Sequence, residues 1–229
     1  MTTKKMAHLI ECVLALTLCC LIAQATEPDV RGVIIFRGAP SWMEATIPST
    51  GVARPLVAEA TSLYTIYSNL GPPTSPFNNM NGWIVSGPDT RDGEEHIAMP
   101  FTPKYNSEVM EIKAAVQFQS GENGVTISLN EDTNGLPGNA LHTWNLSNLP
   151  RFGGCCKLDV VKDGKGLKVE QGKQYWLVAT TNTRTERTID SWDYTYKSAS
   201  GSFAANFGTG WDKESGALSA FGIFGQKTE

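Results

Sequence analysis

Apolar and polar residues alternate with a period of two along several stretches of this chain. Residues 110–119 (MEIKAAVQFQ) and 125–130 (VTISLN) show the pattern most clearly. Side chains of an extended strand point alternately to its two faces, so this spacing buries one set and leaves the other toward solvent. We therefore expect antiparallel, half-exposed strands, with Gly121–Gly124 as the hairpin turn that joins these two.

Residues 175–179 (YWLVA) are apolar on both faces, which predicts a central strand of a sheet. Further strand-like segments are separated by Gly, Pro, Asn, Asp and Ser, and they lie at 63–67, 82–85, 97–101, 141–146, 158–161, 202–207 and 220–224. Many short strands with frequent turn signals are typical of an all-β protein. We predict an antiparallel β-sandwich of the jelly-roll kind.

The N-terminus has the features of a cleaved secretory signal peptide. Lys4 and Lys5 precede an apolar run at 9–23, and Ala23-Gln24-Ala25 provides the small residues that signal peptidase requires. The apolar run is too short to span a membrane comfortably. We therefore expect residues 1–25 to be removed and the mature protein to be secreted, in a periplasmic or extracellular compartment.

Three further segments follow the signal peptide. Residues 26–61 contain Pro40, Pro48 and Pro55 and are expected to form an irregular N-terminal extension. Residues 62–225 form the predicted sandwich domain, and 226–229 are a short polar tail.

The charge pattern argues against two classes of partner. Loss of residues 1–25, whose net charge is +1, changes the formal net charge from −4 to −5, and the remaining Lys and Arg residues are scattered. Nucleic acids and anionic membranes bind clustered basic residues. We therefore expect no nucleic-acid partner. We also expect no membrane span after signal cleavage, because no second apolar run of sufficient length occurs.

The mature chain keeps two of the five cysteines, Cys155 and Cys156, which are adjacent. Their spacing does not fit a CxxC redox or zinc site. A vicinal disulfide, two thiols and bonds to another chain remain open, and we favour the vicinal disulfide.

Several short segments occur in the order found in one known family. They are 67–73 (YSNLGPP), 82–87 (GWIVSG), 98–103 (AMPFTP), 135–138 (GLPG), 172–178 (GKQYWLV), Trp211 and 220–225 (AFGIFG). In this ordered set the chain resembles the choice-of-anchor R domain, a family of exported bacterial proteins. The resemblance covers roughly residues 63–225 and implies a β-rich domain without an assigned biochemical role. The family's C-terminal Pro-Glu-Pro sorting motif is missing here.

The sequence carries no familiar hydrolase or zinc motif. Neither G-x-S-x-G nor H-E-x-x-H occurs, and the mature chain has only His96 and His142 as histidines. A hydrolase, including one that acts on carbohydrate, is therefore the alternative function and not the first hypothesis.

Calcium is the metal with the best support from the sequence. Asp89, Asp92, Glu94 and Glu95 crowd one loop, and Asn130, Asp132 and Asn134 alternate in a second loop. Ca²⁺ prefers such oxygen ligands, although neither spacing matches an EF-hand. The alternative is a solvated acidic loop and a turn whose Asn and Asp side chains cap backbone groups.

Trp192, Tyr194 and Tyr196 alternate within 191–196 and would share one face of a strand. An exposed aromatic row can stack on sugar rings. The alternative, which we favour, is that these rings belong to the sandwich core. The working hypothesis is an exported, non-enzymatic module that binds a glycan or another extracellular or surface component, with these three residues as the candidate binding face.

Overall fold

The computed structural model describes residues 63–155, 157–161 and 166–229. These ranges form strands connected by turns and loops. In chain order the strands are β1 (Tyr64–Ser68), β2 (Phe77–Ser86), β3 (His96–Phe101), β4 (Ser107–Ala114), β5 (Val116–Ser120), β6 (Gly124–Thr133), β7 (Leu136–Ser147), β8 (Asp159–Val161), β9 (Leu167–Val169), β10 (Tyr175–Thr180), β11 (Ile189–Thr195), β12 (Ser200–Asn206), β13 (Trp211–Ala217) and β14 (Phe221–Lys227). The predicted signal peptide and the predicted extension at 26–61 lie outside the described residues.

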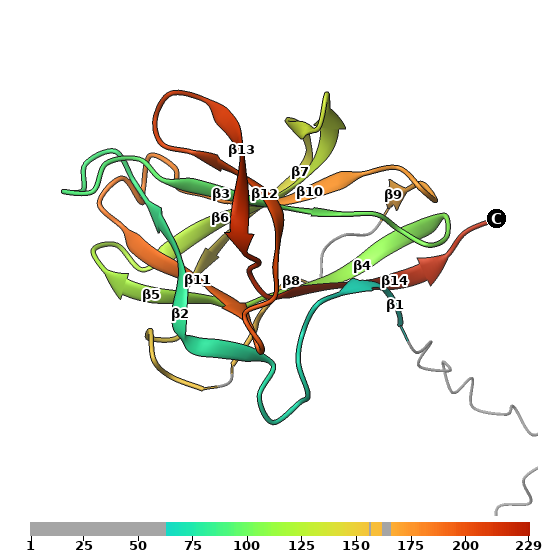
Figure 1. Ribbon diagram of the computed structural model, residues 1–229, viewed down its shortest axis with the longest axis horizontal. Coiled ribbons are helices and arrows are strands. Elements are labelled where there is room, and N and C mark those ends of the chain that lie inside the picture. Colours follow the sequence, from blue (N-terminus) through green and yellow to red (C-terminus); the bar gives the residue numbers. More distant parts are fainter. Residues whose placement is uncertain (1–62, 156, 162–165) are drawn as a thin grey trace, which may run out of the picture. The chain divides into compact units, whose positions relative to one another are not determined.

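The strands form three antiparallel sheets arranged as a sandwich (Figure 1). The six-stranded sheet has the order β13-β12-β3-β10-β6-β7, and β3, β10 and β12 lie in the upper layer of Figure 1. In the five-stranded sheet the order is β1-β14-β4-β8, and β9 also pairs with β4. The three-stranded sheet has the order β2-β11-β5. The prediction of an all-β antiparallel fold is confirmed.

The five- and three-stranded sheets meet along a seam made by Ala115, Asp193 and Ala220. Ala115 N–H donates to Ala220 O at 3.1 Å, and both Asp193 N–H to Ala115 O and Ala220 N–H to Asp193 O measure 2.8 Å. Since Ala115 is the single residue between β4 and β5, the chain passes here from one sheet into the other. The 110–119 segment is therefore two strands and not one.

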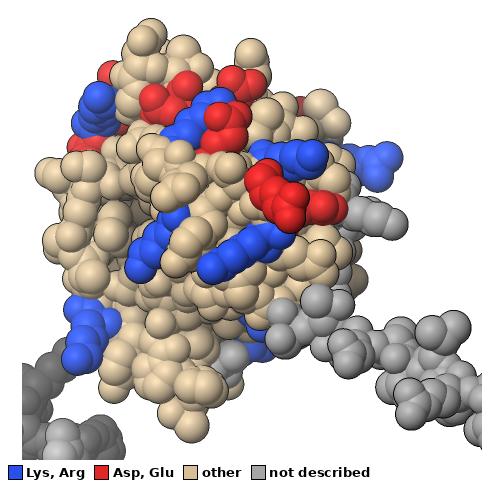
Figure 2. Space-filling model, turned by 90° about the vertical axis from the view of Figure 1, so that its right-hand side faces the viewer, with Lys and Arg blue, Asp and Glu red and all other residues tan. Residues whose placement is uncertain are grey.

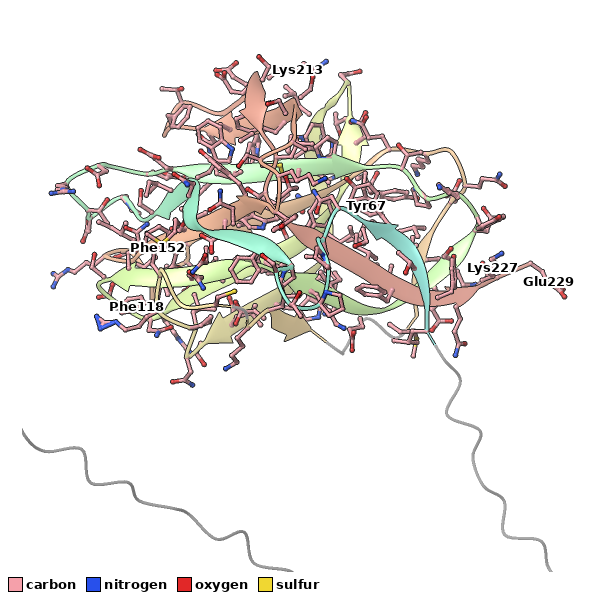
Figure 3. The ribbon with its side chains drawn as sticks, turned by 60° about the horizontal axis from the view of Figure 1, so that its bottom comes forward. Tyr67, Phe118, Phe152, Lys213, Lys227 and Glu229 are labelled. Carbon is pink, nitrogen blue, oxygen red and sulfur yellow. The ribbon has the colours of Figure 1, made fainter. Side chains whose placement is uncertain are left out.

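The main core lies between the six-stranded sheet and the joined sheets. The alternating residues Ile97 and Met99 of β3 and Leu177 of β10 are at most 1% exposed, as are Ile223 of β14 and Trp192 of β11. Tyr67, labelled in Figure 3, stacks on Phe221 with ring centroids 4.9 Å apart. Burial of these side chains is the main stabilising contribution.

The outer face of the six-stranded sheet carries a second, smaller apolar cluster around Trp176. This explains why β10 is apolar on both faces, as expected for a central strand. Leu136 of β7 and Trp211 of β13 pack against this cluster. The indole N–H of Trp176 donates to Asp132 Oδ1 at 2.8 Å, which satisfies the polar atom of a buried ring.

Two expectations about local structure are wrong. Gly121–Gly124 is not a hairpin turn: β5 pairs with β11, whereas β6 pairs with β10 and β7, so the turn crosses between the two layers. Asn130 and Asp132 do not lie in a loop, because β6 extends to Thr133. The hairpin turns at Asn134 and Gly135, both with positive φ, as a tight hairpin turn requires.

The surface of the described residues shows mixed charges. On the face drawn in Figure 2, Lys and Arg side chains lie among Asp and Glu in the upper part, and those in the lower part are separated by uncharged residues. Among the described residues, no helix has the length and apolarity needed to cross a membrane.

Candidate functional site

A polar cavity of about 570 Å³ opens where three segments of the chain converge. The crossover turn contributes Glu122, Asn123 and Gly124, the end of β7 contributes Asn145, Leu146 and Ser147, and the loop after β10 contributes residues 182–185. Volumes of this size are usual for small-molecule sites. The cavity therefore has room for a short saccharide or a ligand of similar size.

A hydrogen-bond network fixes the floor of the cavity. Asn182 Nδ2 donates to Thr126 Oγ1 at 2.7 Å and to Asn145 Oδ1 at 2.9 Å. Thr126 Oγ1 in turn donates to Asn145 Oδ1 at 2.9 Å. These contacts join β6, β7 and the loop after β10, so the side chains that line the cavity are held in place before any ligand binds.

The loop after β10 is ordered by its own side chains. Asn182 Oδ1 accepts the backbone N–H of Arg184 at 2.8 Å, and Thr185 Oγ1 accepts the backbone N–H of Asn182 at 2.8 Å. Asn and Thr side chains commonly form such local bonds and thereby stabilise turns. Because of these hydrogen bonds, the backbone of the loop that carries Arg184 is held in place.

Three polar groups at this cavity have no protein partner among the described residues: Asn145 Nδ2, Glu122 Oε1 and the Arg184 guanidinium group. The other oxygen of Glu122 accepts the backbone N–H of Arg187 at 2.9 Å, which holds the carboxylate at the rim. The side chains of all three residues are exposed. The cavity thus offers an amide donor, a carboxylate acceptor and a guanidinium donor to a ligand.

A second concave surface is an apolar groove of about 570 Å³ between the β1–β2 loop and the β11–β12 turn. Leu70, Pro72, Tyr196 and Leu218 supply much of its lining. Tyr196 is 45% exposed. Nothing in the described contacts indicates what would cover this groove.

The aromatic row does not form a binding face, so this expectation is corrected. Trp192 is 0% exposed, and its indole N–H donates to Ala220 O at 3.2 Å, which makes it a core residue unable to stack on a sugar. Tyr194 is half-buried against Trp83, with ring centroids 5.6 Å apart. Tyr196 leaves the row because β11 ends at Thr195, and it lines the groove instead.

The acidic residues at 89–95 do not converge on one point. Asp92 pairs with Arg91 at 3.3 Å, and Glu94 Oε1 lies 3.1 Å from His96 Nδ1. Burial, reinforced by the charge of Asp92, raises the pKa of Glu95. Asp89 donates its backbone N–H to Glu186. Within the described ranges, no group of three His, Cys, Asp or Glu residues is placed to hold a metal ion; calcium binding stays a prediction.

The alternating residues at 130–134 are also engaged by the protein. Asp132 Oδ1 accepts bonds from Trp176 and Gln174, and its Oδ2 accepts the backbone N–H of Gly135 at 2.9 Å. Despite some burial, these donors and Lys213 lower the pKa of Asp132. Its oxygens therefore stabilise the β6–β7 hairpin and its contact with β10.

His96 lies in a row with a carboxylate and a hydroxyl group. Its Nδ1 faces Glu94, and its Nε2 lies 3.3 Å both from Thr181 Oγ1 and from the backbone nitrogen of Thr181. The backbone N–H can only donate, so Nε2 accepts and Nδ1 carries the proton. Burial lowers the pKa of His96, although Glu94 acts in the opposite direction. Since Nε2 already accepts this N–H, it is poorly placed to deprotonate the hydroxyl group.

The cysteine prediction falls partly outside the described residues. Cys155 is disulfide-bonded. Cys156 lies outside the described residues, so the vicinal pairing stays a prediction.

Comparisons with known proteins give no match: no family model fits the chain, and neither curated proteins nor solved structures are significantly similar to it. The resemblance to the choice-of-anchor R domain stays a prediction. The functional assignment therefore depends on the geometry of the cavity.

Most of this cavity is not evident from the sequence pattern. The relevant signal was residues 180–185 (TTNTRT), an Asn- and Thr-rich loop directly after the most apolar strand. Polar loops at the end of a rigid strand often carry binding residues. Asn145 and Glu122 could not be linked to that loop, because nothing in their spacing shows that β6 lies between β7 and β10.

Proposed function

We propose that this protein is a non-enzymatic, exported β-sandwich module that binds a carbohydrate in the polar cavity. The observation that carries the proposal is the set of groups on Glu122, Asn145 and Arg184 that have no partner among the described residues, above a floor fixed by hydrogen bonds. Sugar hydroxyl groups both donate and accept hydrogen bonds, so they match a cavity that offers donors and acceptors side by side. The predicted signal peptide and the resemblance to the choice-of-anchor R domain support a ligand outside the cell.

The charges at the rim indicate which saccharides suit the cavity. Glu122 and Arg184 carry opposite charges, so the rim has no net preference for an anion or a cation. A carboxylate can accept from two neighbouring hydroxyl groups, and a guanidinium group donates from several N–H groups in a fixed plane. We therefore expect neutral saccharides with adjacent hydroxyl groups to bind better than acidic ones.

A hydrolase remains the alternative, and the row of Glu94, His96 and Thr181 is its specific observation. Two features argue against it: the occupied Nε2 of His96, and the lining of the two cavities described above, which does not include His96. If hydrolysis of a glycan were found, loss of that activity in His96→Gln would identify this row as its site.

The test is a glycan array probed with the purified protein and with the variant Arg184→Ala. Hydrogen bonds to charged groups contribute about 1.5–3 kcal/mol, so we expect binding of the best glycan to weaken roughly 10- to 100-fold. The melting temperature should not change, because the guanidinium group has no described protein contact. Arg151→Ala is the matched control, an exposed arginine outside the cavity, and should bind normally. No bound glycan, or equal binding by Arg184→Ala, would contradict the proposal.

A further inference from the structure

Three aspartates gather at the seam between the five- and three-stranded sheets. Asp193 is itself a seam residue, Asp190 lies three residues earlier on β11, and Asp159 begins β8. In the strand register, Asp159 is opposite Ala114, directly before the seam residue Ala115. Asp159 also accepts a hydrogen bond from the backbone N–H of Val116, the residue directly after Ala115. The three aspartates therefore lie at or near the seam.

Among the described residues, four of their six carboxyl oxygens are buried without a hydrogen-bond partner: both oxygens of Asp190, Oδ2 of Asp193 and Oδ2 of Asp159. Asp190 and Asp193 are 0% exposed, and Asp159 is half-buried. The remaining oxygen of Asp193 accepts the Ser191 hydroxyl group at 2.8 Å. A buried carboxylate without a partner is strongly unfavourable unless it takes up a proton.

The described residues around these aspartates supply little positive charge. Opposite Asp190 stand Val85 of β2 and Phe118 of β5, and opposite Asp193 stands Gly82 of β2. Of the described cations, Lys157 lowers the pKa of Asp159. Asp159 in turn raises the pKa of both partners, since like charges repel.

A loop covers this part of the three-stranded sheet. The buried Gln117 of β5 donates to Gly154 O at 2.5 Å and accepts the backbone N–H of Gly153 at 2.9 Å. Figure 3 shows Phe118 and Phe152 at the same edge, where Phe152 N–H donates to Phe118 O at 2.9 Å. The loop at 149–155 is thus attached to β5, and Asp159 follows it.

We propose that the seam is a proton-dependent joint, closed while its three carboxyl groups are uncharged and loosened as they ionise. Burial is the main cause that raises the pKa of Asp159 to about 7 and those of Asp190 and Asp193 to about 8. Ionisation would draw water to the seam and to the loop above it. The protein would therefore be tighter in mildly acidic than in mildly alkaline surroundings.

The sign of the pH dependence follows from proton binding. Unfolded aspartates titrate near pH 3.8, so above that value the folded chain holds protons that the unfolded chain has lost. Stability from this source is complete below pH 3.8 and decreases as the pH rises through about 7 to 8. Most proteins show the opposite trend, because their carboxylates are stabilised in the ionised form.

The first experiment is urea unfolding of the purified protein from about pH 5 to about pH 9. We expect the midpoint to fall as the pH rises. In Asp190→Asn and Asp193→Asn the midpoint should fall less steeply with pH, because an amide does not ionise. Each variant should release up to about one proton fewer on unfolding. Asp212→Asn, an exposed aspartate of β13, is the matched control and should keep the original slope. If the urea midpoint stayed constant or rose as the pH increased from about 5 to about 8, the proposal would be overturned.

The second experiment covers the case in which the variants do not fold. Infrared spectra at about pH 6, where ordinary Asp and Glu are ionised, should still show the carbonyl band of protonated carboxyl groups in the wild-type protein. That band should disappear as the pH passes about 8. Its absence at about pH 6, or stabilisation by added Ca²⁺ in place of protons, would overturn the proposal.

Discussion

Replacing Trp192 by alanine is expected to lower the free energy of unfolding by about 3–5 kcal/mol. Trp192 is 0% exposed and meets Phe221 edge-on, with ring centroids 6.1 Å apart. Ala220 O still accepts from Ala115 N–H when the indole is removed, so the loss arises mainly from the cavity that the ring leaves. Urea unfolding at one fixed pH measures the effect.

Tyr196→Ala is the matched control, because Tyr196 belongs to the same alternating row but is 45% exposed. Exposed substitutions usually change stability by less than about 0.5 kcal/mol. Equal losses for the two variants would contradict the assignment of Trp192 to the core and of Tyr196 to the surface.

Gly121→Ala is expected to destabilise the protein by more than about 2 kcal/mol, since two costs add. Gly121 has φ +86°, a conformation that costs a non-glycine residue about 1–2 kcal/mol. A Cβ at this position would also collide with the carbonyl oxygen of Arg187. That close approach brings the crossover turn against residues 187–188, where Thr188 Oγ1 donates to Glu122 O.

Gly172→Ala separates the two costs. Gly172 has φ +74°, but a Cβ there would have open space around it. The variant should therefore show only the conformational cost, and the difference between the two free energies of unfolding measures the collision. If Gly172→Ala were as destabilising as Gly121→Ala, the crossover turn would not be in contact with Arg187.

The strands were predictable because burial on one face leaves a period of two in the sequence. The apolar residues at 97–101 and 175–179 indicated strands with buried side chains. The run at 175–179 also indicated a central position in its sheet. Strand partners were not predictable, because alternation is the same whichever strand lies alongside. That is why the alternation predicts one strand at 110–119 and a hairpin at Gly121–Gly124, although Ala115 divides the first segment and the second crosses between layers.

The candidate sites were less predictable than the fold. The aromatic row had the same spacing whether it faced solvent or core, and only the three-dimensional packing placed Trp192 inside. The cavity depends on contacts between residues distant in sequence, such as Asn182 with Thr126 and Asn145. Asp190 and Asp193 read as ordinary polar strand residues, since a sequence does not show that a loop and a second sheet bury them.

The most direct test of the central claim is the map of backbone amide signals that shift when the strongest glycan from the array is added to ¹⁵N-labelled protein. The account predicts that the largest shifts occur at Gly124, Asn145, Asn182 and Arg184, around the polar cavity. Largest shifts at Gly71, Tyr196 and Leu218 would place the ligand in the apolar groove and contradict it.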